Sequence, residues 1–229
     1  MARTAVKGRG AVQVLTALAV ASPVLVLLSV VGVRGGLLPI ETGYDLLTLK
    51  IAWWLSFAGA AAGVLAVVVA LRNFRVLGVV AVVALVFGVG TLGVFIWQTR
   101  QLAAGPVENV STDLTEVPGF GRLRPDRTGG LQPAVGVEAC PGALPVLTQV
   151  SPETAAWALQ EAGFNLGQAG VARADGSRQT VWFGFRYDAV IRIRPGRTDI
   201  RVAARDGRPH GGEACRLATR VSSLLNDTL

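Results

Sequence analysis

The segment 107–120, VENVSTDLTEVPGF, gathers polar side chains at a density that could serve a reaction or a binding site. Its polar cluster consists of Asn109, Ser111, Thr112 and Asp113. A hydroxyl beside a carboxylate can supply a nucleophile and its base when a histidine completes the set. The chain has one histidine, His210, so one hypothesis is a hydrolase that uses His210 with Ser111 and Asp113. No nucleophile elbow or metal-binding motif accompanies these residues.

The alternative interpretation of 107–120 is structural. Short polar side chains form hydrogen bonds with nearby backbone groups where a chain turns into a folded domain. The segment contains Pro118-Gly119, a dipeptide that is typical of turns. The sequence favours such a polar collar over a catalytic loop.

A second set of charged residues lies in 188–205, DAVIRIRPGRTDIRVAAR, which reads as two strands around a Pro-Gly turn. With Arg194 opposite Arg197, Arg192 faces Asp199. One side of the ribbon then carries Asp188, Arg192, Asp199, Arg201 and Arg205. Cross-strand ion pairs, worth about 0.2–1 kcal/mol each, are the plain explanation. The alternative is a face that binds a small anion or a lipid head group, since its arginines outnumber its carboxylates.

The composition indicates a membrane-embedded part, because 51% of the residues are hydrophobic and only 16% are charged. The net charge of +7 could suggest a nucleic-acid partner. However, residues 101–229 hold fourteen arginines against thirteen acidic residues, so the excess flanks apolar segments in the first hundred residues. Nucleic-acid binding needs a local surplus on a folded face. We therefore expect no nucleic acid.

Three segments, 11–33, 51–71 and 76–97, contain no charged side chain. Each reaches the roughly 20 apolar residues that cross a hydrocarbon core. We predict a three-span transmembrane anchor over residues 1–97, with a cleaved signal peptide as the alternative for the first span. Gly59 and Gly63 have the spacing that lets helices pack closely, within the anchor or against another membrane subunit.

Basic residues predict the orientation of this anchor. The N-terminal segment and the loop near residue 73 carry more of them than the loop 34–50. By the positive-inside rule the N-terminus is cytoplasmic, and an odd number of spans places residues from 98 onward outside. We predict a protein of the bacterial inner membrane with a periplasmic C-terminal domain.

The predicted outer part begins with a linker, 98–108, and continues as an α+β domain, 109–229, with an antiparallel sheet and two flanking helices. The first helix is predicted from residue 151, where a serine precedes a proline. The second helix is predicted near the C-terminus from apolar spacing over CRLATRVSSLL.

Two further features are predicted between these helices. Asp175-Gly176 has the composition of a hairpin turn. The following segment 180–186, TVWFGFR, alternates apolar and other residues as a strand does.

Cys140 and Cys215 both fall in the predicted outer domain, where a disulfide is the expected state. Two free buried thiols are the alternative. Two cysteines and one histidine do not make a tetrahedral zinc site, so we expect no metal, and nothing in the chain indicates a cofactor.

The outer domain resembles a family known as domain of unknown function 1499, found in bacterial membrane-linked or periplasmic proteins and in some plastid proteins. Three segments carry the resemblance over roughly residues 107–220: NVSTDLTEVPGF, GFRYDAVIRI and TDIRVAARDG. The matching residues are Thr112, Asp113, Pro118, Phe120, Gly184, Phe185, Asp188, Val190, Ile191, Arg192, Asp199, Arg201, Arg205 and Gly207. His210 and Ala214 depart from the family pattern, which has Asp and Asn there. The resemblance implies a location and a fold type, but no activity.

Together these features favour a non-catalytic accessory or assembly subunit of a membrane complex. Its expected partners are the lipid bilayer and another integral membrane protein or a second copy of the chain. Binding of a small anion or lipid through Arg192, Arg201 and Arg205 is the second hypothesis, and hydrolysis at His210 is the third.

Overall fold

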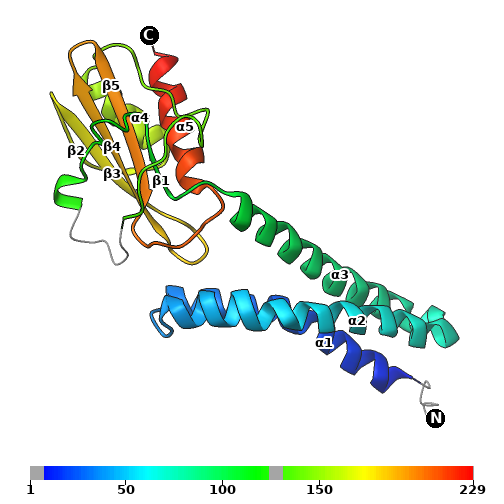
Figure 1. Ribbon diagram of the computed structural model, residues 1–229. Coiled ribbons are helices and arrows are strands. Elements are labelled where there is room, and N and C mark those ends of the chain that lie inside the picture. The colour runs from blue at the N-terminus through cyan, green and yellow to red at the C-terminus, as the bar shows by residue number, and fades with distance from the viewer. Residues whose placement is uncertain (1–7, 124–130, 229) are drawn as a thin grey trace. The chain divides into compact units, whose positions relative to one another are not determined.

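The computed structural model describes residues 8–123 and 131–228. The chain divides into two compact units, Met1–Arg100 and Gln101–Leu229. The first unit is helical, and the second combines a sheet with helices (Figure 1).

The described part of the first unit contains five helical segments, and the last of them continues for four residues into the second unit. They are α1 (Arg9–Arg34), the π-helix η1 (Glu41–Ala52), α2 (Trp53–Ala70), the 3-10 helix η2 (Leu71–Asn73) and α3 (Phe74–Ala104). Among the residues that the structure describes, two helical stretches are long and apolar enough to cross a membrane, Arg9–Arg34 and Glu41–Ala104. The second of these contains both of the later predicted spans, 51–71 and 76–97.

The chain reverses direction at η2, as Figure 1 shows. A Cβ atom on Gly63 of α2 would lie 2.8 Å from the carbonyl oxygen of Ala84 in α3, so the two helices are in backbone contact on either side of the turn. A Cβ atom on Gly59 would lie 3.2 Å from the carbonyl oxygen of Ala19 in α1. Both glycines therefore lie at contacts between helices of this unit, which any larger side chain would separate.

The segment before the second predicted span is more ordered than the sequence suggests. Residues 34–50 are predicted as the loop between the first two spans, yet η1 begins at Glu41 and continues without a break into α2. The hydroxyl of Thr48 donates to the carbonyl of Gly43 at 2.9 Å, which satisfies a backbone acceptor within this wide helix. No proline or glycine interrupts the chain from Tyr44 to Phe57, so nothing local ends the helix there.

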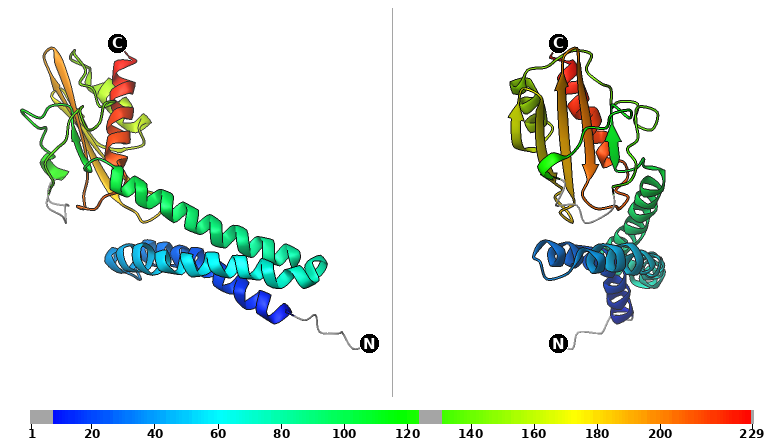
Figure 2. Two further views of the ribbon diagram at one scale, coloured as in Figure 1. Left: turned by 45° about the vertical axis from the view of Figure 1, so that its right-hand side comes forward. Right: turned by 60° about the vertical axis from the view of Figure 1, so that its left-hand side comes forward.

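The described part of the second unit is a five-stranded antiparallel sheet with two α-helices and the short 3-10 helix η3 (Gly121–Leu123). The strands are β1 (Asn109–Ser111), β2 (Asn165–Gly170), β3 (Arg173–Gln179), β4 (Arg186–Arg194) and β5 (Arg197–Ala204), in the order β1-β5-β4-β3-β2. The helices α4 (Pro152–Glu161) and α5 (Glu213–Asn226) cover one face, and the segment after β1 crosses the other (Figure 2). This is the predicted α+β class.

The β4–β5 pair has the predicted register, with Arg192 opposite Asp199 and Arg194 opposite Arg197. Because side chains alternate along a strand, Ile191 and Ile200 face the helices and the charged residues face away. The main core lies between the helices and that face, and includes the fully buried Tyr187 and Leu159.

Both predicted helices form. Ser151 caps α4, accepting a hydrogen bond of 3.1 Å from the backbone N–H of Thr154, and Pro152 follows as its first residue. In α5, Leu217 and Val221 are buried at the predicted spacing.

Two predictions between the helices are wrong. Asp175 and Gly176 lie in the middle of β3, and the turn before β3 is formed by Val171 and Ala172. Gly176 packs so closely on β2 that a Cβ atom would lie 2.9 Å from the carbonyl oxygen of Asn165. Local composition indicated a turn, but close strand packing explains the glycine.

The predicted strand 180–186 is instead the loop 180–185 that joins β3 to β4. The start of the domain also differs from expectation, because α3 stays helical through Ala104, well into the predicted linker 98–108.

Candidate functional site

The charged face of the sheet is an ion-paired network around Asp113 and Asp199. Nη2 of Arg192 lies 2.9 Å from Oδ2 of Asp113 and 3.1 Å from Oδ2 of Asp199. Nη2 of Arg194 contacts the same two oxygen atoms at 3.0 and 2.6 Å. Nε of Arg197 donates to Oδ1 of Asp199 at 2.7 Å. Two strands and the loop after β1 are thereby joined through shared carboxylates.

Asp113 also closes its own turn. Its Oδ1 accepts hydrogen bonds of 3.0 Å from the backbone N–H groups of Thr115 and Glu116. The Glu116 N–H is the main reason that the pKa of Asp113 lies below its usual value; burial opposes the shift, and the Thr115 N–H and Arg194 add to it. The carboxylate is therefore held ionised as a structural acceptor.

The other two arginines of the predicted face are buried and occupied. Arg205 is 9% exposed, and its guanidinium grips Asp188, with Nη2 at 2.9 Å and Nε at 3.1 Å from Oδ1. Arg201 is 8% exposed and donates to Oδ1 of Asn109 at 3.0 Å and to the carbonyl of Pro118 at 2.8 Å. Neither is placed to meet a ligand from solvent.

This arrangement favours the ion-pair interpretation of the face over the anion-binding one. The more exposed guanidinium groups are those of Arg194 and Arg197, and both are bound to carboxylates. A shallow pocket of about 310 Å³ lies beside Arg173, Arg192 and Arg194. An added anion there would compete with Asp113, Asp199 and Glu116, which already neutralise this surface.

The polar cluster of segment 107–120 is likewise engaged with the backbone. The hydroxyl of Ser111 donates to the carbonyl of Asp113 at 2.7 Å. The hydroxyl of Thr112 accepts from the N–H of Ile200 at 2.9 Å, and Asn109 donates to the carbonyl of Gln132 at 2.6 Å. These hydrogen bonds join the segment to β5 and to Gln132. They make the cluster a structural collar.

His210 occupies a buried site of a different kind. Its side chain is 4% exposed, and its ring lies 4.0 Å from the ring of Phe185. Its Nδ1 lies 2.5 Å from the hydroxyl of Tyr187, and its Nε2 lies 3.2 Å from Oδ1 of Asp206.

The titration of this cluster follows from burial. Burial raises the pKa of the Tyr187 phenol, so the phenol stays protonated and can donate to Nδ1 of His210. Burial also acts to raise the pKa of Asp206, but His210 and Arg208 together outweigh it, and the pKa lies below its usual value. Asp206 therefore carries its charge beside the imidazole.

His210 does not meet the partners that the sequence suggested. Tyr187 points to the helix-covered face of the sheet, whereas Arg192 and its partner Asp113 lie on the other face. Tyr187 and Arg192 are also about 17 Å apart along β4, at about 3.3 Å per residue. A pocket of about 220 Å³ touches Asp206 but is not lined by His210. A catalytic set of His210, Ser111 and Asp113 is not formed.

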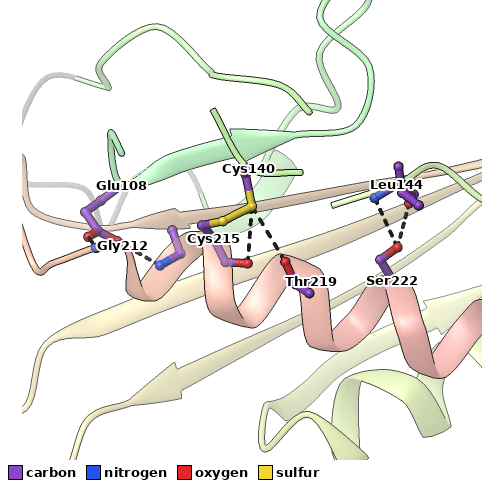
Figure 3. Close-up of a disulfide and its surroundings, with 8 residues drawn as sticks. Glu108, Cys140, Leu144, Gly212, Cys215, Thr219 and Ser222 are labelled. Carbon is purple, nitrogen blue, oxygen red and sulfur yellow. Dashed lines mark hydrogen bonds between the residues drawn. A yellow bond between two sulfur atoms is a disulfide. The ribbon is translucent and has the colours of Figure 1, made fainter. Parts of the chain in front are cut away.

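Sequence reasoning missed the residues around His210 and also Glu108. The Glu108 carboxylate accepts from the backbone N–H groups of Gly212 at 2.7 Å and Ala214 at 2.8 Å (Figure 3). It thus binds the first amides of α5, which has no side-chain cap of its own at Gly212. The only signal in the sequence was a carboxylate close before the polar collar.

Figure 3 also shows how the disulfide holds α5. Cys140 and Cys215 are bonded, with their Cα atoms 5.6 Å apart. About two turns further along α5, the hydroxyl of Ser222 donates to the carbonyl of Leu144 at 2.8 Å and accepts from the Leu144 N–H at 3.1 Å. The loop 140–144 and α5 are thereby joined covalently and by hydrogen bonds.

Over residues 8–123 and 131–228, no group of three or more His, Cys, Asp or Glu side chains is placed to hold a metal ion. No protein-family model, curated protein or solved structure matches this chain.

Proposed function

We propose that this protein is a membrane-anchored accessory or assembly subunit whose α+β domain lies outside the cytoplasm. The observation that carries the proposal is that the charged and polar residues of the domain are occupied by bonds within the domain. Arg201, Arg205 and Asp188 are buried in internal bonds, and His210 is enclosed by aromatic rings. Such a domain presents a stable surface to a partner. A reaction at these four residues would first have to break the internal contacts that hold the fold.

Two further observations support the location. The helices Arg9–Arg34 and Glu41–Ala104 have the length and apolarity of membrane spans, and η2 divides the second into the hairpin α2–α3. Three crossings with a cytoplasmic N-terminus then leave the domain outside. The Cys140–Cys215 disulfide fits an oxidising compartment such as the bacterial periplasm.

Kinship with the family known as domain of unknown function 1499 is part of the same proposal. Several of the matching residues lie on the charged face of the sheet. Asp113, Asp188, Arg192, Asp199 and Arg205 are ion-paired there, and Arg201 donates hydrogen bonds to Asn109 and Pro118. On this proposal the shared pattern preserves the fold of the domain.

A pair of reporter fusions tests the location. A phosphatase that is active only outside the cytoplasm, fused after Leu229, should be active. The same enzyme fused after Arg72, in the turn between α2 and α3, should be inactive. Activity at Arg72 and not at Leu229 would reverse the topology and remove the basis for an extracytoplasmic subunit.

The accessory role is tested separately. The full chain, extracted in mild detergent, should migrate as part of a complex with a defined integral membrane protein or with itself. Purified components should reassemble with a fixed stoichiometry. A free monomer that does not bind the reconstituted membrane fraction would contradict the role while leaving the topology intact.

A further inference from the structure

The loop 180–185 between β3 and β4 exposes large apolar side chains although it has a defined conformation. Val181 is 82% exposed and Trp182 is 63% exposed. The loop is held at its base, where the N–H of Thr180 donates to the carbonyl of Phe185 at 2.8 Å. Behind its tip, Phe183 is buried and pairs with Phe185 at 6.1 Å between ring centroids. Val181 and Trp182 thus form an exposed apolar tip, and buried aromatic residues hold the loop in place behind it.

This loop lies at the end of the sheet where the chain joins the domain. β3 ends and β4 begins there, at the end where β1 begins and β5 finishes. A Cβ atom on Gly105 would lie 2.7 Å from the carbonyl carbon of Gly211, and the neighbouring His210 stacks on Phe185. The loop and the residues that follow α3 are therefore near neighbours within the second unit.

The covalent chain limits how far this end can be from a bilayer. Trp97, 63% exposed, is the last aromatic residue of α3 and ends the third predicted span. From Trp97 to Gly105 a helix advances only about 12 Å, at about 1.5 Å per residue. Indole rings favour the membrane–water interface, and an apolar tip can enter the head-group region by about 5–10 Å.

We propose that the Val181–Trp182 tip inserts into the outer surface of the lipid bilayer and fixes the domain against it. The occupant of this apolar surface is lipid, because the surface is at the tethered end of the domain. The exposed Arg186, directly after the loop, can meet lipid phosphate groups. This inference rests on the proposed membrane anchor and adds a second, separate lipid contact.

The chain offers a matched control. Val171, in the β2–β3 turn, is 79% exposed, almost as much as Val181, but lies at the opposite end of the sheet. Both cysteines are in the disulfide, so a single introduced cysteine carries the label. An environment-sensitive fluorophore is attached to Val181→Cys, Val171→Cys or Val83→Cys in the full chain. Val83 lies within α3 and reports the anchor itself.

Each labelled protein is reconstituted into vesicles of phosphatidylethanolamine and phosphatidylglycerol that contain spin-labelled lipid. We expect lipid quenching at position 181 to be several-fold stronger than at position 171, with aqueous iodide giving the reverse order. Trp182→Ser should reduce the lipid quenching at position 181. Unchanged unfolding midpoints would show that the variants keep their fold.

The outcomes separate the two proposals. Quenching by lipid at position 83, with positions 181 and 171 equally accessible to iodide, would overturn the loop contact and leave the anchor in place. Lipid quenching at 181 without quenching at 83 would support the loop contact and contradict the anchor. Absence of lipid quenching at positions 83 and 181 would overturn the loop contact and the anchor together.

Discussion

The carboxylate of Glu108 accepts a 2.7 Å hydrogen bond from the backbone N–H of Gly212, a residue more than a hundred positions later in the chain. The same side chain also binds the N–H groups of His210 and Ala214. Gly212, at φ 81°, has a left-handed conformation that suits glycine and turns the chain into α5. The residue just before β1 therefore holds the start of the last helix.

Replacing Glu108 with alanine should lower the free energy of unfolding by about 1.5–3 kcal/mol, because buried amides lose a charged acceptor. Glu108→Gln should cost less, since it keeps one acceptor oxygen. Urea unfolding of the full chain in mild detergent measures both values. Glu138 is exposed and makes a matched control; Glu138→Gln should change the unfolding free energy little. Equal effects at positions 108 and 138 would contradict the capping role.

Mutations of Asp188 and Arg205 should have strongly non-additive effects on the free energy of unfolding, because the two side chains form a buried ion pair. Asp188→Asn or Arg205→Met alone leaves one buried partner uncompensated, which costs about 3–5 kcal/mol. Replacing both by apolar side chains should cost much less than the two single changes together. A double-mutant cycle by chemical denaturation gives the coupling energy. In the pair of the exposed Arg216 with Glu213, loss of the arginine should cost under about 1 kcal/mol.

The Asp113 carboxylate should make a contribution to the free energy of unfolding that is lost in acid. Its pKa is lower in the folded chain than in the unfolded chain, so its contribution is complete above the unfolded value of 3.8. That contribution is lost as the pH falls through the lower, folded value. Asp113→Asn should lower the thermal midpoint at pH 7 and flatten its fall below about pH 4. A variant as steep as the parent over that range would contradict this assignment, and Glu138→Gln again serves as the control.

Reduction of the disulfide should destabilise the second unit without unfolding the helices of the first. The sequence separation of 75 residues corresponds to about 4–5 kcal/mol of loop-closure entropy. Cys140→Ser with Cys215→Ser should give the same loss as reductant, and reductant should then have no further effect. Near-ultraviolet dichroism and urea unfolding would measure the change. Full stability in reductant would show that the noncovalent Leu144–Ser222 contacts suffice.

The sequence by itself determined the features that repeat with a short period or lie at a single terminus. The two-residue turn at Pro195-Gly196 predicted the β4–β5 register, because placing Arg194 opposite Arg197 fixes every other pair along the two strands. Ser151 and Pro152 predicted the start of α4 for an equally local reason. The apolar segments predicted long helices, because a helix satisfies the backbone hydrogen bonds of such a segment internally.

Only the tertiary structure decided which polar groups meet. Asp175-Gly176 looked like a turn, but a neighbouring strand requires the glycine and Arg173 binds the buried carboxylate at 3.1 Å. His210 joined Tyr187 and Asp206 because β4 begins, and the loop after β5 starts, at the same end of the sheet. Such contacts join residues distant in the chain. Their energies depend on burial and on the supporting shell, and no local pattern encodes either one.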